Sequence, residues 1–227
     1  MAHAHKIFVA LATVALLASG ACKKDASTTG KPAQEAMGLY AKGFNTLIKD
    51  PKQMITEYFQ NIPRSGPELK DATSKLKLYP RQSFATGKIK EARDAFEAAK
   101  QAAPESLAGL AAPADQAIAA IDKVATAFTA AQKYYEAENY KDDQLAKGKE
   151  LHVQMVAASK EFDDAIGKLA AGLSTVEDEQ AKAELAKYEG DKDYSYWFRF
   201  YNMEAKKFLN AVESARTPEE LGKLDAP

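Results

Sequence analysis

The chain has 227 residues, of which 46% are hydrophobic and 28% charged, and its formal net charge is −1 at pH 7. A near-neutral chain with interspersed charges lacks the basic face that displaces counterions from phosphates, so nucleic acid is not an expected partner. Glycine and proline are few, and the sequence holds no strand pattern or hairpin dipeptide. We therefore expect an all-α protein.

The first predicted element is a signal peptide over residues 1–21. An apolar run from Ile7 to Ala18 follows a start that contains Lys6, and small residues then lead to Cys22, the only cysteine. The run has about twelve residues, whereas a helix that crosses a bilayer needs roughly 20. A cleaved leader is therefore favoured over a transmembrane helix.

The stretch from Leu16 to Cys22 (LLASGAC) resembles the lipobox of bacterial lipoproteins. In such proteins the matching cysteine receives a diacylglycerol group, the bond before it is cut, and the new amino terminus is acylated. The resemblance implies lipidation of Cys22 and a membrane partner reached through that lipid. Each buried methylene contributes about 0.8 kcal/mol, so several acyl chains anchor a protein stably. An ordinary secreted protein cut near Ala18 or Ala21 is the alternative.

Residues 22–33 are expected to form a flexible tether, because the stretch from Lys23 to Lys31 is polar and rich in small residues and cannot bury a core. A lysine directly after Cys22 resembles lipoproteins sorted to the outer membrane. We expect one helical domain over residues 34–227, facing the periplasm, at the outer membrane rather than the inner one.

The first helix of this domain is predicted to start near Pro32, because apolar residues then recur at steps of three and four. Asp50–Pro51 is expected to restart or kink it, and the segment from Ile62 to Pro67 to end it. Residues 68–87 carry no clear pattern. A short helix is predicted over 88–103.

Two longer helices are predicted next, each with one apolar stripe. The first stripe contains Leu110, Ala114, Ile118, Ile121, Ala125, Phe128 and Tyr135. The second contains Leu151, Met155, Ala158, Phe162, Ile166, Leu169, Leu173 and Val176. Each helix has about 30 residues, or roughly 45 Å, and the near-heptad spacing favours antiparallel, coiled-coil-like packing in an elongated bundle.

Three signals mark the ends of these elements. Asn139 marks the end of the first long helix, and Asp142 or Asp143 is expected to cap the second, in which Gly172 could mark a break. The last long helix is predicted over residues 192–215. A capping-box sequence beginning at Thr217 follows it.

The last long helix contains an unusual density of aromatic residues. Its aromatic cluster consists of Tyr194, Tyr196, Trp197, Phe198, Phe200 and Tyr201. Tyr194, Trp197, Phe198 and Tyr201 fall within about 100° and suit a core, whereas Tyr196 and Phe200 point the opposite way. We expect both sides to be buried, by the first helix or by residues 68–87. The alternative is a partner or ligand patch at Tyr196, Trp197 and Phe200.

No catalytic residue, metal site or cofactor is expected. His152 is the only histidine after the leader and lacks partners at ligand spacing, so it is interpreted as an ordinary residue on a helix flank. Asp142, Asp143 and Glu150 are explained as caps and as ion pairs with Lys147. A single cysteine cannot form a zinc cluster, a haem-attachment pair or an intrachain disulfide.

The block from Tyr134 to Met155 (YYEAENYKDDQLAKGKELHVQM) resembles the YiiG-like bacterial lipoproteins, a family catalogued as a domain of unknown function. The resemblance implies a helical, envelope-located protein and no catalytic residues. We expect a non-enzymatic, lipid-anchored binding or scaffold module with an envelope protein as partner. The rival is a periplasmic enzyme or small-ligand carrier with a site between helices near Tyr134, Tyr140 and Trp197. A structural lipoprotein without a stable partner is a third interpretation.

Overall fold

A computed structural model describes residues 30–68, 82–190, 192–215, 217 and 220. Over these residues the chain forms helices and no strand, which confirms the all-α class. The helices are α1 (Gly30–Lys49), α2 (Lys52–Asn61), α4 (Gln82–Ala102), the 3-10 helix η1 (Glu105–Leu110), α5 (Ala111–Glu136), α6 (Tyr140–Asp143), α7 (Ala146–Ala186) and α8 (Tyr194–Ser214). The leader and Cys22 lie outside the described residues.

The break between α1 and α2 falls at Asp50–Pro51, as the sequence predicts. Proline has no backbone N–H and disfavours a helical conformation at the residue before it. Helical hydrogen bonding resumes at the start of α2, where the N–H of Met54 donates to the carbonyl of Pro51 at 3.1 Å. The predicted end of this helical stretch is also confirmed, because Ile62 is extended (φ −121°, ψ 117°) ahead of Pro63.

Two helix boundaries differ from the expected ones. α1 begins at Gly30, so the last residues of the expected tether, 30–33, are helical. α4 begins at Gln82 rather than near residue 88. Most of the segment expected to lack a pattern, 69–81, lies outside the described residues.

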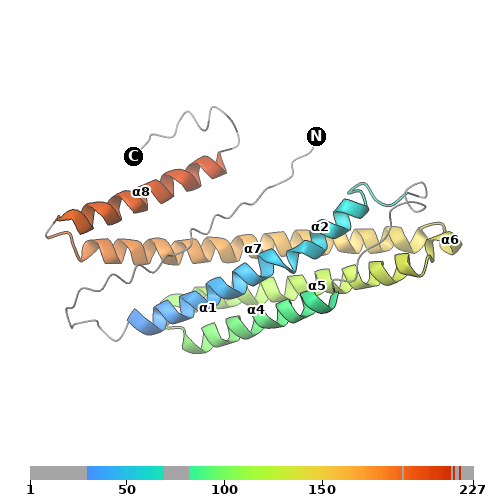
Figure 1. Ribbon diagram of the computed structural model, residues 1–227, viewed down its shortest axis with the longest axis horizontal. Helices are drawn as coiled ribbons and strands as arrows, with labels where there is room; N and C mark the ends of the chain where they lie inside the picture. Colours follow the sequence, from blue (N-terminus) through green and yellow to red (C-terminus); the bar gives the residue numbers. More distant parts are fainter. Residues whose placement is uncertain (1–29, 69–81, 191, 216, 218–219, 221–227) are drawn as a thin grey trace.

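The bundle is built from two closely packed helix pairs, α1 with α4 and α5 with α7 (Figure 1). Contacts of α4 with α5 and of α1 with α7 join the pairs. The chain turns at α6, at one end of the long axis, so that α7 returns alongside α5 (Figure 1). The elongated helical bundle is confirmed, while the coiled-coil geometry of the long helices stays a prediction.

The core between these helices is aromatic and aliphatic. Its largest fully buried side chains include Tyr40, Phe44, Tyr58, Phe96, Phe128 and Phe162. Both predicted stripes point inward, since Ile121 and Phe128 on α5 and Leu169 on α7 are fully buried. α1 and α4 approach closely at Gly43, where a Cβ would overlap the ring of Phe96.

α7 is a single helix of 41 residues. The break expected near Gly172 is wrong: the glycine instead allows close packing, because a Cβ there would lie 2.9 Å from Leu110 Cδ2. No residue of α7 after Leu173 is buried. Val176 is half-buried and still packs against the core. At a rise of 1.5 Å per residue, the part from Val176 to Ala186 extends about 15 Å beyond it.

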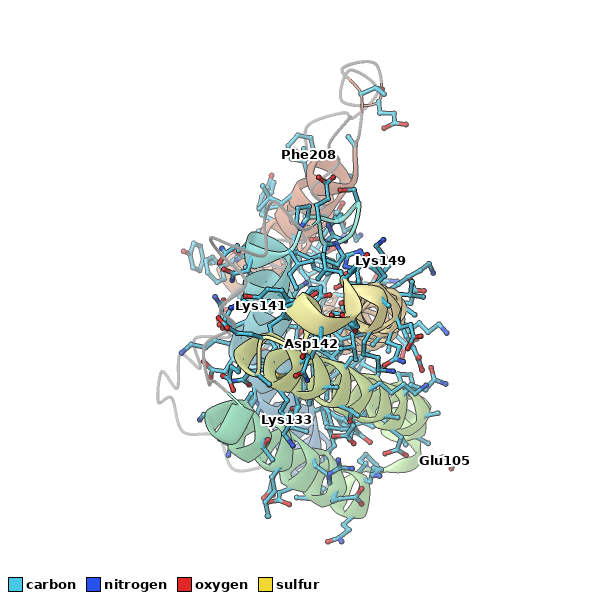
Figure 2. The ribbon with its side chains drawn as sticks, turned by 90° about the vertical axis from the view of Figure 1, so that its right-hand side faces the viewer. Glu105, Lys133, Lys141, Asp142, Lys149 and Phe208 are labelled. Carbon is cyan, nitrogen blue, oxygen red and sulfur yellow. The ribbon has the colours of Figure 1, made fainter. Side chains whose placement is uncertain are left out.

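α8 lies outside the bundle, with α7 as its main packing partner. Seen along the bundle from the α6 end, α8 and its residue Phe208 stand apart from the group formed by α1, α4, α5 and α7 (Figure 2). The predicted bounds of this helix are confirmed to within two residues. Among the described residues, no helix combines the length and the apolar composition that crossing a bilayer requires.

Candidate functional site

The first candidate site is a buried polar cluster near the α6 end, where α2 meets α7. The hydroxyl of Tyr58 lies 3.3 Å from Nδ1 of His152, and Nε2 of His152 lies 3.1 Å from the backbone oxygen of Arg64. A carbonyl can only accept, so Nε2 carries a proton and Nδ1 of a neutral ring accepts from Tyr58. Burial raises the pKa of the Tyr58 hydroxyl, which keeps it a donor. The cluster ties the chain after α2 to α7.

The interpretation of His152 as a flank residue is wrong, because its side chain is buried. Its ring stacks on Tyr58, with centroids 5.9 Å apart, and meets the edge of Phe59. The guanidinium of Arg64 lies over the ring of Phe59, 4.2 Å from its centroid. The spacing of His152 from Gly148 and Met155 places all three on the inward side of α7, a signal that sequence reasoning missed.

The second feature at this end is the cap of α7. Asp143 accepts from the Tyr134 hydroxyl at 2.7 Å and from the N–H groups of Leu145 and Lys147 at 3.0 Å each. These hydrogen bonds, that of Tyr134 foremost, lower the pKa of the Asp143 carboxyl. Asp143 thus bonds the first turn of α7 as predicted, although the N-cap position itself is occupied by Leu145. Lys147 pairs with Glu150 at 2.7 Å as expected, but it meets Asp143 through its backbone rather than as an ion pair.

Close packing holds the tyrosines of this end in place. Gly148 allows α7 to approach α5, since a Cβ there would lie 3.0 Å from Tyr134 Cε1 and 3.1 Å from the Tyr135 hydroxyl. Burial raises the pKa of both phenols, so they stay protonated and are poor nucleophiles. Within the described residues, no group of three or more His, Cys, Asp or Glu side chains could hold a metal ion. The geometry is that of a structural clamp.

The second candidate site is the side of α8 that faces away from α7. The large apolar side chains exposed on this helix are Tyr194 (81%), Trp197 (43%), Phe198 (53%), Tyr201 (59%) and Leu209 (59%). At 100° per residue they share an arc of about 140° that contains no charged residue. We call this arc the outer face of α8. Its residues are Tyr194, Trp197, Phe198, Tyr201, Asn202, Ala205, Phe208, Leu209 and Val212.

The expected burial of the whole aromatic cluster is therefore wrong, and the expected direction of its two sides is reversed. Tyr196 and Phe200, expected to point away, are half-buried on the α7 side and stack at 6.2 Å. Tyr194, Trp197 and Tyr201, expected in a core, are exposed. Of the predicted patch of Tyr196, Trp197 and Phe200, only Trp197 belongs to the outer face.

Ion pairs explain this orientation. Nζ of Lys206 lies 2.8 Å from a carboxylate oxygen of Glu177 and 3.3 Å from one of Asp178, both on α7. Arg199 lies 3.9 Å from Glu184 and over the ring of Tyr188. The part of α7 beneath α8 is rich in charge, so it attracts the cations of α8 rather than its aromatic rings. The apolar arc is left facing outward.

The structure does not assemble the site expected for the rival enzyme or carrier. Tyr134 packs against Gly148 near the start of α7, whereas Trp197 lies close to Arg199, which reaches Glu184 near the end of α7. The rise of the helix puts about 50 Å between these two levels of α7. Trp197 and Tyr134 cannot line one pocket.

A surface groove between α5 and α7 also holds charged side chains, and they are paired with one another or with neighbours. Lys123 bridges the groove to Glu161 at 2.5 Å, and Asp122 bonds Arg93 on α4 at 2.7 Å. The charged side chains of this groove thus form surface ion pairs.

Comparison with known proteins places residues 32–226 within the family described as "Protein of unknown function (DUF3829)". The chain is 24% identical over 192 residues to the "Uncharacterized protein YiiG" of Escherichia coli strain K12. The alignment covers 82% of this chain and 53% of that relative, so the chain spans about half the length of the curated relative it matches. No solved structure matches the chain.

Proposed function

The chain belongs to the DUF3829 family, and on that premise we propose that it is a lipid-anchored, non-enzymatic helical module of the bacterial cell envelope that makes its contacts through the outer face of α8. Three features support this proposal: the lipobox-like stretch that ends at Cys22, the start of the family match at residue 32, and the exposed aromatic arc. The arc is the observation that carries the binding role.

The arc supports a binding role because its spacing is that of a buried helix face. Apolar side chains recur at Tyr194, Trp197, Tyr201, Phe208 and Leu209, at steps that normally face a core. Solvent-exposed apolar patches of this kind mark contact surfaces in soluble proteins. The opposite side of α8 is already used for α7, so the arc is available to something other than the bundle.

The proposed anchor is tested on native membranes by mass spectrometry of the amino-terminal peptide. We expect a peptide that begins at Cys22 and carries acyl chains, recovered in the outer-membrane fraction. A peptide that begins elsewhere with an unmodified thiol contradicts the anchor.

The proposed contact surface is tested by photo-crosslinking in cells. A photoreactive residue in place of Tyr201 is expected to give crosslinked products, whereas one in place of Val153, which is 67% exposed on α7, serves as the matched control. Equal absence of products at both positions contradicts binding through the outer face.

A further inference from the structure

We propose that the outer face of α8 lies on the surface of the bilayer that carries the lipid anchor. This inference deepens the proposed function and rests on its anchor at Cys22. It names a lipid surface, rather than a protein, as what covers the arc. Three observations favour it: the kinds of side chain in the arc, the pairing of the nearby charges, and the place where the tether joins the bundle.

The side chains of the arc suit a membrane–water interface better than a helix–helix contact from which water is excluded. Tyr194, Trp197 and Tyr201 combine an apolar ring with a polar group, and such residues are enriched where a membrane meets water. A second helix packed on the arc would bury two hydroxyls and an indole N–H that need partners. At a bilayer surface, headgroups and water supply those partners while the rings enter the apolar region.

The ion-paired charges of α8 lie away from the arc. Arg199 and Lys206 reach carboxylates on α7, and Lys207 pairs with Glu204 at 2.5 Å on α8 itself. Nothing charged has to be desolvated when the arc meets lipid. Because Arg199, Lys206 and Lys207 are already engaged in ion pairs, the contact should depend little on anionic lipid or on salt.

The short tether keeps the arc close to the membrane. Between Cys22 and Gly30, where α1 begins, the chain spans at most about 28 Å. The start of α1 lies toward the end of the long axis where α7 gives way to α8, opposite α6 (Figure 1). Acyl chains on Cys22 therefore hold α8 near the bilayer at a high effective concentration, so a weak contact suffices.

Trp197 is the only tryptophan of the chain and lies within the arc, so its fluorescence reports the contact directly. The full chain, purified from membranes with its lipid, is reconstituted into vesicles of phosphatidylethanolamine and phosphatidylglycerol. Some of the acyl chains are brominated near the headgroup. We expect a blue-shifted emission that loses most of its intensity to the bromines, at low and at high salt alike.

The test variant is Tyr194→Glu with Tyr201→Glu, both at exposed positions, so circular dichroism should match that of the parent. We expect this variant to lose the blue shift and the quenching. Val153→Glu with Val156→Glu places the same charge on exposed apolar sites of α7 and should retain both.

Two outcomes overturn the inference. One is a lipidated protein whose Trp197 emits as in water and is unaffected by brominated lipid. The other is a Trp197 that is shielded from aqueous and lipid quenchers alike in samples where copies of the chain crosslink to each other, which assigns the arc to self-association. The mass of the amino-terminal peptide is measured on the same sample. A missing lipid contradicts the proposed anchor and is thereby distinguished from both of these outcomes.

Discussion

The ring of His152 on α7 stacks on the ring of Tyr58 on α2, and the Tyr58 hydroxyl lies 3.3 Å from its Nδ1 atom. Through Nε2 the same ring holds the backbone oxygen of Arg64, at 3.1 Å. The side chain of His152 thus joins α7 to α2 and to the loop that follows α2. Tyr58 and Arg64 precede His152 in the sequence by 94 and 88 residues.

We predict that Tyr58→Phe and His152→Leu are coupled. Each removes one end of a buried hydrogen bond, so each should lower the free energy of unfolding by about 1–3 kcal/mol. The double variant should lose less than the sum of the two, by about 0.5–1.5 kcal/mol, because the second change breaks a bond already lost. Urea denaturation measures all four species. Strict additivity would show that the two side chains do not interact.

Gly148 is predicted to be intolerant of alanine. The new Cβ would crowd Tyr134, Tyr135 and Leu145, so Gly148→Ala should cost about 1–3 kcal/mol. Gly167 lies on the same helix with nothing within 4 Å of a Cβ, and Gly167→Ala should stabilise by about 0.5–1 kcal/mol. Thermal melts of the two variants should shift in opposite directions, and a shared direction would count against the packing described here.

Asp143 is predicted to make stability depend on pH. Its pKa is lowered in the folded state, chiefly by the hydrogen bond from Tyr134. The ionised group therefore stabilises the fold above its ordinary pKa of 3.8, and this contribution is lost as the pH falls through the lower folded-state value. Asp143→Asn should lower the melting temperature at about pH 7, and the gap to the parent should narrow toward about pH 3.

The neighbouring Asp142 provides the control for this experiment, because its side chain is exposed. Asp142→Asn should leave the melting temperature close to the parent across the same range. A constant gap between Asp143→Asn and the parent at every pH would show that ionisation of Asp143 does not contribute.

Lys206 is predicted to hold α8 on α7. Lys206→Glu places a third carboxylate beside Glu177 and Asp178, so amide hydrogen exchange along α8 should speed up while exchange in α5 stays unchanged. Lys207→Glu is the matched control, because Lys207 pairs only within α8, with Glu204. Equal acceleration by both variants would mean that charge on α8, and not the bridge to α7, controls its docking.

Much of the fold could be predicted from local signals. Asp50–Pro51 marks the break between α1 and α2, and the stripes through Ile121, Phe128 and Leu169 mark the inward faces of the long helices. These signals work because proline chemistry and the 3.6-residue period act within one helix. The cap at Asp143 could be predicted for the same reason.

The orientation of α8 could not be predicted in this way. A stripe shows that a helix has an apolar side but does not identify the neighbour, and the part of α7 next to α8 carries Glu177, Asp178 and Glu184. Matching those carboxylates to Arg199 and Lys206 would have indicated which side faces α7. His152 was missed because the interpretation gave its polarity more weight than its position.

The turn into α7 could not be read from composition either. Gln144 and Leu145 both take the left-handed conformation, with φ of 51° and 69°, which side chains other than glycine rarely adopt. Leu145 is buried, and its N–H is held by Asp143. Tertiary packing compensates here for an unfavourable backbone conformation. Because glycine is the residue expected at such a position, Gln144 and Leu145 do not indicate a left-handed turn in the sequence.

The part of α7 beyond Val176 extends past the core and separates the molecule into two parts of different stability. The bundle around α5 is closed by buried rings, whereas the far part of α7 and all of α8 are held together mostly by half-exposed ion pairs and partial contacts. The sole indole sits in that weaker part. When the protein is heated, the emission of Trp197 should therefore report the release of α8 and the far part of α7. Calorimetry should show that the other helices melt cooperatively at a higher temperature.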